Sequence, residues 1–342
     1  MPARSISTPA AAYEVAEVLR TASDLRQGVV PFGGGLSLGT GNVTEPVEIG
    51  LDLNGLRGVS SYHPADLTLS VGAGTTFAEI AATLSEQEQE LPIDVPFPER
   101  ATIGGLIATG FAGPRRLAAG SLKDLLIGCE FVRGDGLLAK AGGMVVKNVS
   151  GFEIPRLLHG SWGSLAVLTS VNLKVVPAPK SEATLVLAVE SLESGLEQAI
   201  ALLASEPGVS ACTLSRAGDA TTVAVRCMGR DRAVGAMIAG LETHAARCAT
   251  EIDMLHASGS RLFWQAQVEE WAVASSDVVV TIATRPRHLG TVAALVQDRF
   301  RSSDGQFALI ASPGTGSIRF RLESSVVAAT ELRAWWDSAA LP

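Results

Sequence analysis

Hydrophobic and polar residues alternate along the first half of the chain in short stretches that predict strands separated by helices. Val47, Ile49, Leu51 and Leu53 occupy every second position, as in a strand with one buried face. Residues 67–71 predict another strand. Thr76 and Glu79 then have the spacing of a capping box, and the apolar residues that follow at helical spacing predict a helix, namely Phe77, Ile80, Ala81 and Leu84.

The second half has a different order of elements. Strand-like and helical stretches follow one another in the order expected of an antiparallel sheet covered by helices, as in ferredoxin-like units. The predicted strands are residues 183–189, 222–227, 278–283, 307–310 and 318–322, and the predicted helices are residues 192–203, 232–246, 289–300 and 326–336. We therefore predict an α+β protein.

Two short turns predict hairpins. Gly134-Asp-Gly136 lies between two strand-like stretches, and Asp-Gly tolerates the positive φ of a tight hairpin turn. Pro313-Gly-Thr-Gly316 predicts a second hairpin late in the chain.

Composition narrows the range of partners. The chain has 342 residues, of which 47% are hydrophobic and only 18% are charged, which favours a buried subunit contact. The net charge of −8 and the lack of a Lys/Arg cluster argue against nucleic acid binding. The first 20 residues predict an amphipathic helix rather than a signal peptide, and no stretch predicts a membrane span.

Cysteine and histidine spacing predicts no metal site. The four cysteines lack C-x-x-C spacing, and we interpret them as small core residues: Cys129, Cys212, Cys227 and Cys248. The five histidines lack the H-x-x-H or H-E-x-x-H spacing that places two imidazoles on one helix face. His159 lies closest in sequence to a glycine segment, but we interpret it as structural and name no catalytic base.

A glycine-rich loop at residues 31–42, PFGGGLSLGTGN, follows the apolar pair Val29 and Val30. Glycine permits positive φ and lets amide groups approach a ligand closely, so such a loop can bind a phosphate through its backbone. The loop is neither a Rossmann nor a Walker motif, because Leu38 and Thr40 stand where those motifs require glycine and lysine. Taken alone, it fits a structural turn equally well.

Two further glycine segments favour a ligand-binding role for this loop over a purely structural turn. They are Ala101-Thr-Ile-Gly-Gly105 and Gly160-Ser-Trp-Gly-Ser-Leu165, the latter leading into Leu173-Lys174. With the first loop, these segments resemble, in content and order, the FAD-binding domain shared by vanillyl-alcohol oxidase and p-cresol methylhydroxylase, the PCMH type.

Finer features resemble one branch of that family, the smaller FAD-binding subunits of bacterial glycolate oxidases. The features are Gly113-Pro-Arg-Arg116 followed by Gly120 and Asp124, and Lys147-Asn148 followed by Gly151-Phe152. The resemblance covers about residues 1–180. It implies a two-lobed PCMH-type FAD-binding domain at residues 1–179, and we predict a ferredoxin-like cap or partner domain at residues 180–342.

The resemblance also implies the cofactor contacts. The first loop would bind the FAD diphosphate, and the second glycine segment would form the opposite wall of that site. Further residues would line the cleft that holds the flavin, or lie near the flavin ring or the adenine end of FAD. The implied residues are Pro31, Gly33, Gly34, Gly35, Leu36 and Ser37, then Thr102, Gly104 and Gly105, then Gly113, Arg115 and Gly120, and finally Ala166 and Val167.

Several departures and alternatives bear on these contacts. Ala166 stands where glycine is more usual, and the first loop has no histidine or cysteine, so we predict non-covalent FAD. Arg115 and Arg116 fit either an anion-binding role or solvated surface charge. Lys147 and Asn148 fit either a place near the flavin or a polar strand end satisfied by backbone groups.

Three hypotheses about function follow. In the first, the chain is an FAD subunit of a complex that oxidises glycolate or a similar 2-hydroxy acid to the 2-oxo acid, with a larger FAD-binding subunit and an iron–sulfur subunit as partners. In the second, it is a non-catalytic scaffold of that complex. In the third, it is a stand-alone flavin oxidase or reductase. By resemblance we expect a cytoplasmic protein that reaches the inner membrane face only through partners.

Overall fold

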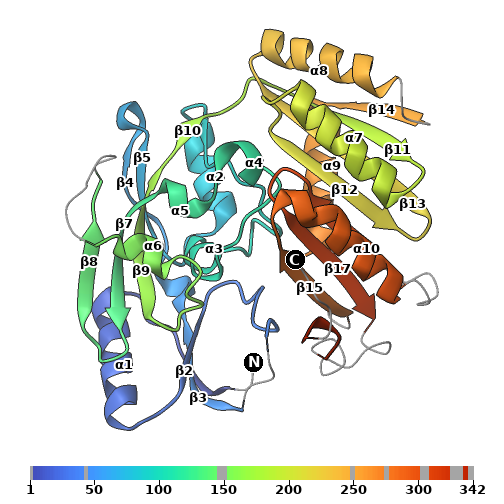
Figure 1. The fold of residues 1–342 in the computed structure, drawn as a ribbon. Coiled ribbons are helices and arrows are strands. Elements are labelled where there is room, and N and C mark those ends of the chain that lie inside the picture. The colour runs from blue at the N-terminus through green and yellow to red at the C-terminus, as the bar shows by residue number, and fades with distance from the viewer. Residues whose placement is uncertain are drawn as a thin grey trace. The chain divides into compact units, whose positions relative to one another are not determined.

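The computed structural model describes residues 3–41, 45–144, 152–246, 251–272, 277–300, 308–323 and 334–337 (Figure 1). The chain forms two compact units. The first comprises Met1–Gly113 and Gly120–Ala178, and the second comprises Pro114–Ala119 and Pro179–Pro342. The short excursion of Pro114–Ala119 into the second unit has no signal in the hydrophobic pattern.

A small parallel sheet opens the first unit. Its strands run in the order β1 (Ala3–Ser7), β3 (Val47–Asp52) and β2 (Val29–Phe32). Helix α1 (Ala12–Asp24) connects β1 to β2, and its buried face packs in a cluster with Leu51 and Val167. This packing explains the alternation along residues 47–53, because one face of β3 is buried.

A larger antiparallel sheet completes the first unit. Its strand order is β4 (Val59–His63), β5 (Thr68–Gly72), β9 (Ala166–Lys174), β7 (Leu126–Arg133) and β8 (Leu138–Gly142). Helices α2 (Phe77–Ser85), α3 (Ile103–Thr109), α5 (Leu122–Leu125) and α6 (Ile154–Leu158) accompany it, with a two-stranded ribbon of β6 (Gln89–Glu90) and β10 (Val176–Pro177) and the short turns η1 (Leu53–Gly55) and η2 (Pro64–Asp66). Its core includes the fully buried Val71, Ile80, Ile103, Ile107 and Leu173.

The structure confirms the local predictions in this unit. Helix α2 begins at the predicted capping box, in which the Thr76 side chain accepts from the Glu79 amide and the Glu79 carboxylate accepts from the Thr76 amide. The predicted first hairpin joins β7 to β8, and Gly136 has φ +77°. The second strand begins at Leu138, since Leu137 still closes the turn by accepting from the Arg133 amide.

The second unit is one seven-stranded antiparallel sheet. Its order is β14 (Glu251–His256), β11 (Ser181–Val189), β13 (Ala220–Gly229), β12 (Ala211–Ala217), β16 (Ala308–Ser312), β17 (Ser317–Glu323) and β15 (Asp277–Ala283). Its helices are α4 (Arg116–Ala119), α7 (Leu192–Ser205), α8 (Asp231–Ala245), α9 (Ala257–Glu270) and α10 (Leu289–Phe300), with the turn η3 (Pro286–His288). The predicted α+β class is confirmed, but β12 and β14 were missed.

The two faces of this sheet are covered differently. Helices α7, α8 and α10 contribute to a large apolar core with one face, for example through Ala199, Leu241 and Val296. Helix α9 lies on the opposite face, where Trp264 packs on Ala211 and Ala224. The predicted hairpin at Pro313–Gly316 joins β16 to β17.

Cysteine burial agrees with the structural interpretation. Cys129, Cys212 and Cys227 are buried free thiols, and burial raises the pKa of each to about 12. Cys248 lies outside the described residues. The helices in the described part of the chain include none that is long and apolar enough to cross a bilayer.

Candidate functional site

The first glycine loop leaves the carboxyl end of β2 and packs directly on the second glycine segment. A Cβ on Gly33 would overlap the Thr102 hydroxyl and lie 2.9 Å from its methyl carbon. A Cβ on Gly34 would overlap the carbonyl oxygen of Arg100 and lie 2.7 Å from its carbonyl carbon. Glycine is therefore required here by close backbone approach.

The second segment is fixed in turn by the chain just before α2. The Ile103 amide donates to the carbonyl of Thr75 at 2.9 Å, and the Gly104 amide donates to the carbonyl of Ala73 at 2.8 Å. The Phe77 amide donates to Ala101 at 2.8 Å. These bonds hold residues 101–105 in one position against the first loop.

The third segment, residues 160–165, packs against Pro31 of the first loop and against the end of α3. A Cβ on Gly163, which has φ +71°, would lie 2.9 Å from the Pro31 ring. The Gly160 amide donates to the carbonyl of Ile107 at 3.0 Å, and the Trp162 amide donates to Ala108 at 2.8 Å. The structure thus brings together the three segments that the sequence singled out.

Backbone amides are available in the first loop, whereas most of those in the second segment already have acceptors. The amides of Gly34, Gly35, Leu36 and Ser37 donate to no residue that the structure describes. By contrast, the Gly105 amide already donates to the Thr102 hydroxyl at 3.3 Å, as the N-cap bond of α3. The first loop can therefore supply several amides to an anion, whereas the second segment serves as its support.

This geometry fits the diphosphate of FAD. Successive amides without a described acceptor on a half-buried loop offer several donors to phosphate oxygens. No charged side chain is needed for such a contact, which agrees with the acidic composition of the chain.

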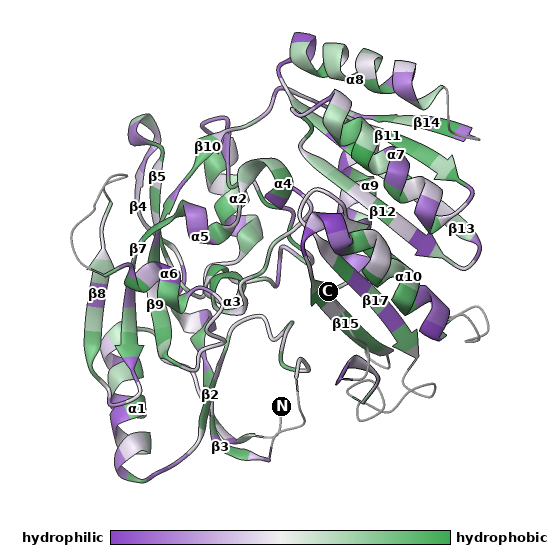
Figure 2. Ribbon diagram, viewed as in Figure 1, coloured by the Kyte–Doolittle hydropathy of each residue, from purple (hydrophilic) through white to green (hydrophobic). Residues whose placement is uncertain are grey.

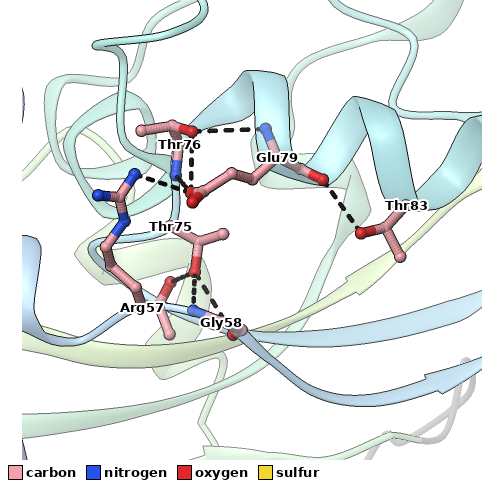
Figure 3. Close-up of polar contacts among 7 residues, drawn as sticks. Arg57, Gly58, Thr75, Thr76, Glu79 and Thr83 are labelled. Atoms are coloured by element: carbon pink, nitrogen blue, oxygen red, sulfur yellow. Dashed lines mark hydrogen bonds and ion pairs between the residues drawn. The ribbon is translucent and has the colours of Figure 1, made fainter.

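A polar network behind the second segment fixes the start of α2 (Figure 3). The Glu79 carboxylate accepts from the Thr76 hydroxyl at 2.9 Å and pairs with Arg57 at 3.0 Å. The Thr75 hydroxyl accepts from the Gly58 amide at 3.0 Å and donates to the carbonyl of Gly72 at 2.7 Å. The carbonyl groups of Ala73 and Thr75 that receive residues 103 and 104 are therefore held in place.

Loss of this cap should destabilise the first unit. A Thr76→Ala variant is expected to lose about 1 kcal/mol of unfolding free energy, because the Glu79 amide loses its acceptor. Thr83→Ala in the same helix is the matched control, since its exposed hydroxyl only bonds back to the Glu79 carbonyl. Urea unfolding measures both, and equal losses would contradict a special role for the cap.

The same carboxylate should make stability depend on pH. Burial raises the pKa of Glu79, but hydrogen bonds from Thr76 and the ion pair with Arg57 outweigh it, so the pKa lies below the ordinary glutamate value. A lowered folded-state pKa means that the contribution is present above the unfolded pKa and is lost as pH falls through the folded value. The stability difference between wild type and Glu79→Gln should therefore shrink on acidification, and a difference that grows would contradict this.

Other implied contacts have packing roles of their own. A Cβ on Gly113 would lie 2.6 Å from the Asp94 carbonyl oxygen, and Gly120 has φ +75°. Ala166 and Val167 are buried in β9, so only their backbone groups could reach a ligand. Arg115 is half-buried and belongs to the second unit. Their contact with FAD stays a prediction.

Some supporting residues were missed at the sequence level. A Cβ on Gly72 would overlap the Leu56 carbonyl oxygen, and one on Gly74 would overlap that of Leu53. Asn54 donates to the Gly33 carbonyl at 3.2 Å. Gly72 at the end of β5 and Gly74 just after it are visible in the sequence, whereas no sequence pattern singles out Asn54. Asn42, Lys147, Asn148 and Gly151 lie outside the described residues.

The described residues contain no group of three or more His, Cys, Asp or Glu side chains that could hold a metal ion.

Comparison with known proteins identifies the first unit. Residues 3–152 match the family described as FAD binding domain. The chain is 40% identical over 136 residues to the glycolate oxidase subunit GlcE of Escherichia coli K12, covering 40% of this chain and 39% of that protein. It is 28% identical over 204 residues to the glycolate oxidase subunit GlcD of Bacillus subtilis 168, covering 59% and 43%.

A solved structure extends the likeness in fold. Alkyldihydroxyacetonephosphate synthase aligns with a TM-score of 0.72 at 15% identity, covering 97% of this chain and 70% of that one. The alignments with the two curated relatives span about two fifths of their length. Residues 3–152 therefore match the family of FAD binding domains, and FAD is the cofactor that this match indicates.

Proposed function

We propose that this chain binds FAD non-covalently, with the diphosphate on the amides of residues 33–37. The observation that carries the proposal is the combination of free amides at this loop with glycines that leave no room for a side chain. Thr102, Gly104 and Gly105 form the supporting wall behind the loop. The remaining contacts would come from the residues that the family resemblance implies.

We further propose that the chain is an FAD-binding subunit of a complex that oxidises glycolate or a similar small 2-hydroxy acid. Bound FAD supplies an acceptor for the hydride that leaves C2 of the acid, while the hydroxyl proton passes to a base and the 2-oxo acid forms. The electrons then pass to an iron–sulfur partner. The similarity to two glycolate oxidase subunits supports this proposal.

The same similarity supports an assembly of related chains. The chain matches subunits with two different names, GlcE and GlcD, which suits a hetero-oligomer built from a smaller and a larger FAD-binding subunit. By resemblance, we place the complex in the cytoplasm, with any contact with the inner membrane face made through partners.

The visible absorption spectrum of the purified chain tests the cofactor and its role. A flavin band that disappears on anaerobic addition of glycolate would make this chain catalytic by itself. A band that persists alone but bleaches in the assembled complex would place substrate oxidation on a partner and electron relay here. A purified chain with no flavin band would contradict FAD binding.

A variant in the first loop distinguishes the scaffold hypothesis from a role in oxidation. In a correctly assembled complex, unchanged turnover after Gly34→Ala would mean that flavin in this chain is dispensable. Reduced turnover with intact assembly would support the proposed role in oxidation.

A further inference from the structure

Hydrophilic and hydrophobic residues alternate along strand β17 of the second-unit sheet (Figure 2). Ile318, Phe320 and Leu322 are buried in the large core. Because side chains alternate along a strand, Arg319 and Arg321 point to the opposite face. Two arginines thus occupy the face that α7, α8 and α10 do not cover.

Helix α9 covers only part of this opposite face. Its Trp264 packs over Ala211 and Ala224, on β12 and β13. Towards β15 the face is more open: Ile310 and Arg319 are half-buried, and Thr281 is exposed. A ligand could therefore reach the part of the sheet formed by β16, β17 and β15.

The two arginines differ in their partners. Arg321 lies at the end of α9, where its guanidinium donates to the Glu270 carbonyl, lies 3.8 Å from the Glu270 carboxylate and stacks 5.0 Å from the Trp271 ring centre. Arg319 has no acceptor among the residues that the structure describes. Arg321 thus already has an acceptor, whereas Arg319 has none among the described residues.

The positions beside Arg319 on the adjacent strands and towards the hairpin carry no charge. Ile310 and Thr281 lie opposite it on the two adjacent strands. Ser317 precedes it by two positions on the same face, and Ser312 is the partner of Ser317 on β16. These positions offer hydroxyl groups but no carboxylate.

A guanidinium partly removed from water without a counter-charge is costly, and a bound anion offsets that cost. Burial accordingly lowers the pKa of Arg319. Guanidinium presents two parallel N–H donors that match the two oxygens of a carboxylate, which makes carboxylates the natural ligands of such a position.

We propose that Arg319 binds the carboxylate of a small organic acid on the open face of β16 and β17, with the hydroxyls of Ser312 and Ser317 beside it. The choice of glycolate as that acid rests on the proposed function. The geometry itself assigns an anion that the guanidinium can bind, and the choice of a carboxylate also rests on the proposed function. Arg319 is thereby a substrate-binding residue, and no proton or electron transfer is assigned to it.

Calorimetric titration of the FAD-loaded full chain with glycolate tests the binding. We expect Arg319→Met to weaken glycolate binding about 10- to 100-fold, because a charge-assisted hydrogen-bonded pair is lost. Arg216→Met is the matched control, since Arg216 pairs with Leu309 and so lies on the other face, and it donates to the Gly218 carbonyl. Glycolate that fails to bind the wild type, or binds Arg319→Met equally well, would overturn the inference.

The neutral analogue glycolamide separates charge recognition from packing. Wild type should prefer glycolate, and the preference should disappear in Arg319→Met but persist in Arg216→Met. A preference that persists in Arg319→Met would assign carboxylate recognition elsewhere.

Thermal unfolding without ligand excludes a structural role. An arginine that lacks a carboxylate in the folded chain should be replaceable by methionine with an unchanged or higher melting temperature. A large loss of stability would show that Arg319 pairs with a carboxylate of the chain itself, which would contradict the inference. The proposed function is judged separately, by flavin bleaching in the assembled complex, and can stand if Arg319 proves irrelevant.

Discussion

A Gly34→Ala variant is expected to bind FAD about 5- to 150-fold more weakly than wild type. The new methyl group would overlap the Arg100 carbonyl oxygen, and relief of such an overlap costs roughly 1–3 kcal/mol. The first loop would have to move away from residues 100–102, and its free amides would leave their present positions. Flavin absorbance per chain, together with titration of the apoprotein with FAD, measures the effect.

Gly39→Ala is the matched control for this prediction. It lies in the same loop, a Cβ at this position would have no atom within 4 Å, and neither glycine has a positive φ. The same chemical change therefore adds a methyl group without a clash. Equal loss of FAD in the two variants would show that the loop responds to lost flexibility rather than to the contact with Arg100.

An Arg226→Met variant is expected to lose roughly 3–5 kcal/mol of unfolding free energy in the second unit. Arg226 and Glu182 form an ion pair at 2.8 Å, and their side chains are only 4% and 5% exposed. Removal of the guanidinium leaves the Glu182 carboxylate buried with a neutral donor, the Ser260 hydroxyl at 2.6 Å. Urea unfolding followed through the fluorescence of Trp264, whose ring lies 5.6 Å from the guanidinium carbon, reports the loss.

Two further variants locate the cause of that loss. Arg133→Met removes an exposed partner of Asp135, with side chains 55% and 52% exposed, and should change stability by less than about 1 kcal/mol. The double variant Glu182→Leu/Arg226→Met removes both buried charges and should recover much of the stability. A double variant as unstable as Arg226→Met alone would assign the effect to packing instead of to the unpaired carboxylate.

The buried network around this pair shows why the position of α9 could not be predicted. Ser260 and Trp264 of α9 bind the strand residue Thr184, at 2.7 and 2.8 Å. The serine and threonine carry no periodic hydrophobic signal, so the pattern does not indicate which face of the sheet the helix packs on. The contact joins positions 76 and 80 residues apart, a separation that no local pattern reveals.

At the candidate site, too, the sequence indicates some features of the glycine segments and only the folded structure indicates the others. Their composition and order indicated the FAD-binding family, and the capping box at Thr76 located the start of α2, because both depend on local backbone chemistry. The separate roles of the glycines depend on tertiary contacts. Gly34 packs against Arg100 and has a free amide, whereas the Gly104 amide is already bound to Ala73.

The sequence by itself determined the elements whose signals are local: the alternating strands, the capped helix, the tight hairpin turns and the ordered glycine segments. Only the tertiary structure decided which backbone amides are left for a ligand and which arginine on the open sheet face lacks a partner among the described residues. The physical reason is that hydrogen bonds and charges are satisfied between segments distant in sequence, so the groups that remain available are known only after the chain has folded.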